Sequence, residues 1–176
     1  MQWEKHLTAL ATLATFAVAA TVSVPAAAAD YKVAPSVTAP LEKSPKVALL
    51  IGNSYSFYNC GVHTALRGLM QKGEPKESMK TRLLTISSGS LSFHDVAQYL
   101  SPHEQDPYAD VEDGKLKHPM FDVVVLQGHS AAATSKKRVP YFEKYAKAHA
   151  ETIRAAGSTP LLVMTWPKKD KPEDIR

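Results

Sequence analysis

The chain has 176 residues, 44% of them hydrophobic, with a formal net charge of +4 and one cysteine, Cys60. A single cysteine excludes an internal disulfide and a zinc site of the Cys₂His₂ or Cys₄ kind. The basic residues are spread along the chain, and their short runs are not interleaved with aromatic residues, so we expect no nucleic-acid partner.

Residues 1–29 are predicted to be a signal peptide. Lys5 provides a weakly positive start, residues 7–20 form an uncharged apolar run, and the small residues 26–29 offer a cleavage site. The apolar run is shorter than the ~20 residues that a membrane-spanning helix needs, although an uncleaved anchor is the alternative interpretation. We therefore expect a periplasmic or secreted protein, with no stable membrane insertion after cleavage of the signal peptide.

Residues 30–45 are rich in Ala, Pro, Ser and Lys and have no periodicity, which predicts a flexible leader before a single domain at 46–176. The continuous apolar run 47–51 is typical of a strand that is buried on both faces. After it, apolar residues recur at helical spacing from Val62 to Met70, and the Gly73-Glu74-Pro75 sequence ends this predicted helix.

The same strand, turn and helix pattern then repeats. Further strands are predicted at 83–86, 121–126 and 160–166, and helices at 92–100, with Ser92 as its cap, and at 141–156, closed by Gly157. The polar segment 101–120 is interpreted as a loop that forms a rim or lid. Connections of this length predict an α/β fold with a parallel sheet between two layers of helices, incomplete at its C-terminus because no fifth strand follows.

Small and polar residues follow the first three predicted strands, at 52–56, 87–90 and 127–130. Ligands of such sheets bind beyond the carboxyl ends of the strands, so these clusters predict a site. Ser54 lies between the first strand and a helix, where helix N–H groups can stabilise a developing oxyanion. A nucleophilic serine needs a base, however, and the simpler interpretation is that Ser54 or Ser56 caps the helix.

The run Ile51-Gly52-Asn53-Ser54-Tyr55-Ser56 resembles the first block of the SGNH (GDSL-like) hydrolases, commonly Gly-Asp-Ser-x-Ser, and Ser54 falls on its nucleophile. Gly89 matches the glycine of the second block, and Gly128-His129-Ser130 resembles the third, commonly Gly-x-Asn-Asp. The resemblance covers residues 46–130. It implies a three-layer, flavodoxin-like fold and a serine esterase, without cofactor or metal, that acts on a small-molecule or carbohydrate ester.

The resemblance also implies an oxyanion hole formed by the backbone N–H groups of Ser54 and Gly89. Ser130 stands where the family has Asn as a further donor, and Gln127 is the alternative to it. Asn53 replaces the usual Asp, whose side chain supports the loop in the family. The residues expected at the rim of the site are Asn53, His94, Gly128 and His129.

The last block of the family, Asp-x-x-His, occurs nowhere in residues 1–176. We therefore expect a fragment that is inactive alone, with its base pair in a missing C-terminal segment, and we interpret His94 and His129 as polar residues rather than as the base. One alternative is a catalytically inactive periplasmic module of the same fold that binds a carbohydrate or an anion. Another is a chain that does not fold stably and whose fourth strand is an exposed hydrophobic edge.

Overall fold

A computed structural model describes residues 39, 41, 43–73, 75–103, 105–166 and 169. These residues belong to one compact unit, 35–176. The predicted signal peptide, 1–29, and most of the predicted leader, 30–45, lie outside the described residues.

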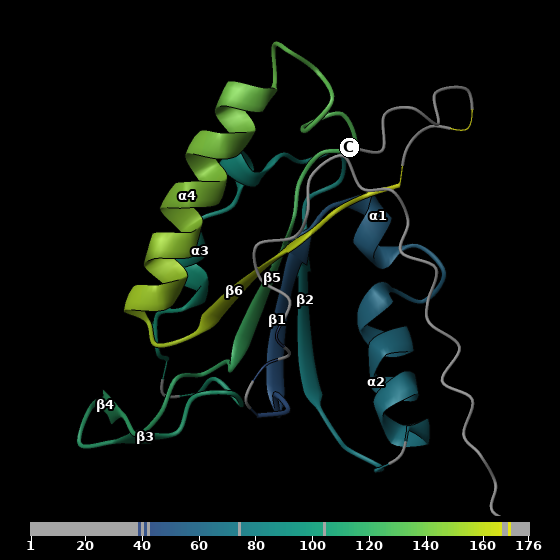
Figure 1. Ribbon diagram of the computed structural model, residues 1–176. Coiled ribbons are helices and arrows are strands. Elements are labelled where there is room, and N and C mark those ends of the chain that lie inside the picture. The colour runs from purple at the N-terminus through teal and green to yellow at the C-terminus, as the bar shows by residue number, and fades with distance from the viewer. Residues whose placement is uncertain are drawn as a thin grey trace, which may run out of the picture. The chain divides into compact units, whose positions relative to one another are not determined.

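Four parallel strands form the central sheet, in the order β2-β1-β5-β6 (Figure 1). Without the two short strands of a separate hairpin, this is the order of the doubly wound flavodoxin-like folds. The predicted fold class, α/β with a parallel sheet, is confirmed. The strands are β1 Val47–Gly52, β2 Lys80–Thr85, β5 Val123–Gln127 and β6 Thr159–Val163.

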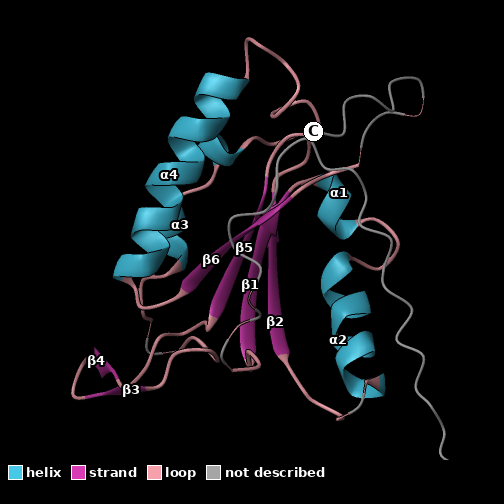
Figure 2. Cartoon of the chain, in the orientation of Figure 1, coloured by secondary structure: helices cyan, strands magenta, loops and turns pink. Residues whose placement is uncertain are grey.

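Helices cover the two faces of this sheet (Figure 2). Alternate residues of β1 point to opposite faces, as the geometry of a strand requires. Leu49 and Ile51 pack in a core with α3 (Val96–Tyr99) and α4 (Val139–Ala155), whereas Ala48 and Leu50 pack under α2 (Val62–Lys72). Within the described part of the chain, no helix is long and apolar enough to cross a membrane.

The helix predicted at 92–100 is wrong in its start and in its cap. The chain forms a short 3₁₀ helix, η1 Leu91–Phe93, and then α3, whose cap is Asp95 rather than Ser92. The Asp95 carboxylate accepts a hydrogen bond from the Gln98 N–H at 3.0 Å. The closing glycine of α4 is as predicted, because Gly157 has a φ of +79°.

The sequence suggested that the segment 101–120 forms a rim or lid. The structure shows instead that this segment does not lie over the carboxyl ends of the strands. It contains the hairpin of β3 (Val111–Glu112) and β4 (Lys115–Leu116), which Figure 1 shows at the opposite end of the sheet from α1 (Ser54–Phe57). The reason is that a parallel connection must return to the amino ends of the strands. Helix α3 is only four residues long, so this segment completes the return.

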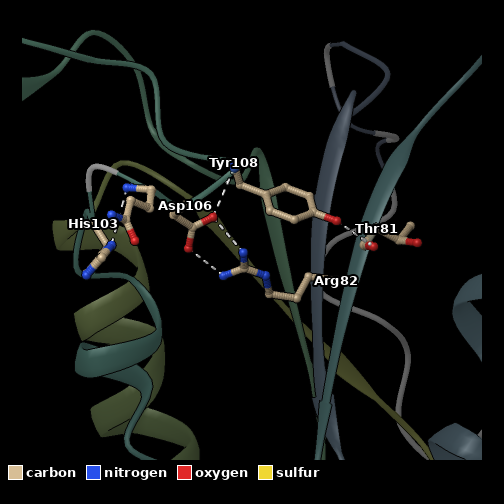
Figure 3. Close-up of polar contacts among 6 residues, drawn as sticks. Thr81, Arg82, His103, Asp106 and Tyr108 are labelled. Carbon is tan, nitrogen blue, oxygen red and sulfur yellow. Dashed lines mark hydrogen bonds and ion pairs between the residues drawn. The ribbon is translucent and has the colours of Figure 1, made fainter.

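An ion pair attaches this segment to the sheet (Figure 3). Arg82 of β2 donates two hydrogen bonds to the Asp106 carboxylate, at 2.8 and 2.5 Å, and its guanidinium lies 4.4 Å from the centre of the Tyr108 ring. The Tyr108 hydroxyl donates to the carbonyl oxygen of Thr81 at 2.9 Å. Both anchor points are in the first half of β2, which keeps 101–110 away from the carboxyl edge.

Among the described residues, strand β6 is an exposed edge of the sheet and pairs with β5 alone. Leu162 is 57% exposed and Val163 44% exposed. The hydrophobic edge expected at the fourth strand is therefore present. Unpaired backbone groups together with apolar side chains make such an edge prone to association.

Candidate active site

Asn53 joins the three turns that follow β1, β2 and β5. Its buried side-chain Nδ2 donates hydrogen bonds to the carbonyl oxygens of Gly89, at 3.0 Å, and Gly128, at 3.4 Å. Its Oδ1 accepts from the Tyr55 N–H at 3.1 Å. The convergence of these three turns at one edge, expected from the sequence, is thus observed. Asn53 itself lies beneath the site rather than at its rim.

Gln127, at the end of β5, forms hydrogen bonds with the turns that follow β1 and β5. Its buried Oε1 accepts hydrogen bonds from the Asn53 N–H and from the Ser56 hydroxyl, both at 3.0 Å. Its Nε2 donates to the carbonyl oxygen of Gly128. Gln127 therefore fixes the turn after β1, and one of its two amide hydrogens is already bound to Gly128.

Two of the motif glycines are needed because the chain packs so closely here. A Cβ at Gly52 would lie 2.5 Å from the Ser56 hydroxyl and 2.6 Å from Oε1 of Gln127. A Cβ at Gly128 would lie 2.8 Å from the Phe142 ring. Glycine at both positions allows the turns after β1 and β5 to meet.

Ser54 is the first residue of the short helix α1, Ser54–Phe57, and is half-buried. The cap of this helix is Asn53, so the interpretation of Ser54 or Ser56 as the cap is wrong. The Ser56 hydroxyl is instead buried against Gln127. In the described part of the chain, neither the hydroxyl nor the backbone N–H of Ser54 has a hydrogen-bond partner. Ser54 thus presents a hydroxyl and a free helix N–H together.

The predicted oxyanion hole is only partly compatible with these contacts. The Gly89 N–H donates to the carbonyl oxygen of Ile86 at 2.8 Å, because the turn closes on itself. The single N–H of Gly89 is therefore not available to an oxyanion in this geometry, and one of the two amide hydrogens of Gln127 is occupied as well. Ser130 is half-buried, and its hydroxyl has no partner among the described residues. Among the described residues, the predicted donors that remain wholly without a partner are the Ser54 N–H and the Ser130 hydroxyl.

His94 is buried beneath the site and not at its rim, contrary to prediction. Its Nε2 donates to the carbonyl oxygen of Gly52 at 3.1 Å, and its Nδ1 accepts from the Tyr99 hydroxyl at 3.4 Å. Burial lowers the pKa of His94, since the imidazolium would lose its hydration. The neutral ring holds the end of β1 in place.

His129 is half-buried in the turn after β5. Its Nδ1 accepts hydrogen bonds from the Ala131 N–H, at 3.1 Å, and from Arg138, at 2.7 Å, so its proton is on Nε2. Partial burial and the Arg138 charge lower the pKa of His129. Among the described residues, no hydrogen bond joins His129 or His94 to Ser54.

One feature of the edge was not predicted from the sequence. The rings of Tyr55 and Trp166 stack with centroids 4.7 Å apart and planes 6° apart. Trp166 is 65% exposed and so belongs to the rim. The contact joins residues far apart in the sequence, so no local pattern indicates it.

Within the described ranges, no group of His, Cys, Asp and Glu side chains is arranged to hold a metal ion.

Fold and geometry together define a doubly wound α/β protein with a candidate site at the carboxyl ends of its strands. No protein-family model and no curated protein matches the chain. Among solved structures, a putative SGNH hydrolase from Slackia heliotrinireducens is similar, with 19% sequence identity and a TM-score of 0.45. The similarity covers 72% of this chain and 59% of that one.

Proposed function

We propose that the protein is an exported serine hydrolase that cleaves acyl esters of a carbohydrate or another small molecule, with Ser54 as its nucleophile. The observation that carries the proposal is the position of Ser54. It begins α1 directly after Asn53, whose side chain binds the turns of Gly89 and Gly128. A hydroxyl that has no partner in the described part of the chain, at the junction of three strand-end turns, fits the geometry of a nucleophile.

In the proposed reaction, the Ser54 hydroxyl attacks the ester carbonyl and forms a tetrahedral intermediate. The Ser54 N–H and the Ser130 hydroxyl would donate to its oxyanion, where one donor is worth about 3–4 kcal/mol in other hydrolases. A base must remove the proton of Ser54 and return it to the leaving alcohol. We propose that an Asp-x-x-His segment, which residues 1–176 do not contain, supplies it.

A second candidate is a binding module of the same fold without catalysis. It is favoured by the contacts of two histidines close to the turns. His94 donates to Gly52 and His129 accepts from Arg138, so in the described part of the chain neither is positioned as a base for Ser54. Without a base, a triad enzyme loses almost all of its rate. The two candidates therefore differ in whether any ester is turned over.

The test is hydrolysis of p-nitrophenyl acetate by the complete product of the gene, together with two variants. Ser54→Ala should lose at least about a thousandfold in kcat/KM. Ser87→Ala, which changes an exposed serine of the second turn, should retain full activity. A folded complete product without turnover would favour the binding module, and equal activity of Ser54→Ala would exclude Ser54 as the nucleophile.

A further inference from the structure

A pocket opens beside the candidate active site, on the side of α4. It lies between the segment 90–92, the turn 129–132 and the first turns of α4. Ser90 and His129, which line it, directly follow the two glycines that Asn53 binds. Most of its wall is apolar or aromatic, from Leu91, Ala132, Tyr141, Phe142 and Tyr145.

The charged group of this pocket is Arg138, at the start of α4. Its guanidinium donates to Nδ1 of the neutral His129 at 2.7 Å, and within the described residues no carboxylate lies within 4.0 Å of it. No acidic side chain is among the described residues that line the pocket. A guanidinium has five N–H donors, so most of them remain available to a ligand.

The volume of the pocket suits one ring. It is about 170 Å³. An apolar cavity of roughly 150 Å³ in another protein binds benzene. Aromatic walls favour the flat face of a ring, and a guanidinium at one side favours a carboxylate, which it can bind with two hydrogen bonds.

We infer that this pocket binds a single ring that carries a carboxylate, with Arg138 on the carboxylate and the side chains of Tyr141, Phe142 and Tyr145 around the ring. Because the pocket begins one residue beyond Gly89 and Gly128, this ring would be the part of the substrate beside the scissile ester. That placement relative to the ester rests on the proposed function, whereas binding in the pocket does not. The ring belongs either to an aromatic acid or to a uronic acid sugar.

The test measures binding to the folded protein by ligand-observed NMR, with two pairs of probes. 4-Fluorobenzoate is compared with 4-fluorobenzamide, and glucuronate with glucose, so that each pair differs in its negative charge. At least one carboxylate should bind roughly tenfold more tightly than its neutral partner, as expected for one charged hydrogen-bonding contact. The pair that responds identifies the kind of ring.

Two matched variants distinguish a direct contact between Arg138 and the carboxylate from an effect of the protein's overall charge. Arg138→Gln should remove the preference for the carboxylate, whereas Lys137→Gln, an exposed neighbour that does not line the pocket, should preserve it. The inference is overturned if neither carboxylate binds, if the neutral probe binds equally well, or if both variants lose the preference equally. Ser54→Ala should bind the probe unchanged, so failure of the esterase proposal would not be mistaken for failure of this one.

Discussion

The side-chain amide of Asn53 donates a hydrogen bond to the carbonyl oxygen of Gly89, 36 residues away in the sequence and 3.0 Å away in space. The same nitrogen reaches the carbonyl oxygen of Gly128. An ionised aspartate, the usual residue in the block that this sequence resembles, has no hydrogen to donate to either oxygen. Asparagine in place of aspartate therefore allows this side chain to donate hydrogen bonds to both carbonyl oxygens.

Asn53→Asp should therefore destabilise the fold by about 3 kcal/mol at neutral pH, because a buried charge would face two carbonyl oxygens. Chemical denaturation followed by circular dichroism measures this loss. The loss should shrink in acid, where the protonated carboxyl group can donate one hydrogen bond. Asn59→Asp, an exposed change in the next turn, should alter the free energy of unfolding by less than about 0.5 kcal/mol. Equal stability of the two variants would contradict this role of Asn53.

Sequence patterns predict those parts of the fold that depend on local apolar periodicity. The run 47–51 and the helical spacing from Val62 to Met70 indicate β1 and α2 directly, because β1 is buried and Leu66 and Met70 of α2 pack against the core beside it. The convergence of three turns also follows, since carboxyl ends of parallel strands share one edge. Helix 92–100 was too long because its polar and apolar residues suit a helix locally, whereas His94 is buried against β1 and interrupts it.

The details of the site depend on contacts that no local pattern contains. Gln127 looks like a donor at the end of a strand, but its side-chain nitrogen already donates to the carbonyl oxygen of Gly128. The Gly89 N–H looks free until the turn is seen to close on Ile86. In both cases a neighbouring polar group satisfies the residue first, because buried hydrogen-bonding groups are rarely left unpaired.

The stability of the protein should fall as the pH is lowered through the range in which histidine titrates. Because the pKa of His94 is lowered from its ordinary value of 6.5, the unfolded chain takes up a proton before the folded one does. The stabilisation by neutral His94 is therefore complete above pH 6.5 and is lost as the pH falls below it, by at most about 1.4 kcal/mol per pH unit.

Urea unfolding between neutral and mildly acidic pH, compared in wild type and His94→Gln, measures this contribution. The variant should lose stability less steeply with acid than the wild type does. A wild-type profile with the same slope as His94→Gln would show that His94 is not responsible.

The Arg82–Asp106 pair should require the shape of arginine as well as its charge. The side chains are 24% and 14% exposed, and the contact uses two parallel hydrogen bonds. Arg82→Lys keeps the charge but loses the paired geometry and the stacking on Tyr108, which should cost about 1–2 kcal/mol of unfolding free energy. Arg154→Lys, on the exposed side of α4, is the matched control and should cost little. If both substitutions lower the free energy of unfolding equally, the Arg82–Asp106 pair does not depend on the geometry of arginine.

In a protein made of residues 1–176, the exposed strand β6 should promote association between molecules. Leu162→Lys places a charge on the most exposed apolar residue of this strand and should reduce the fraction of higher-mass species. Size-exclusion chromatography with light scattering measures that fraction. Thr159→Lys adds the same charge at the exposed, polar start of β6 and is the control for net charge. An unchanged mass distribution in Leu162→Lys would mean that association does not use this edge.

The role of Ser54 as nucleophile is tested most directly by identifying the residue that a fluorophosphonate probe modifies in the complete product of the gene. We predict one phosphonylated residue, Ser54, identified by mass spectrometry of the peptide that follows β1, and no adduct in Ser54→Ala. An adduct on another serine, or none in a folded and complete protein, would contradict the assignment of Ser54 as an activated nucleophile.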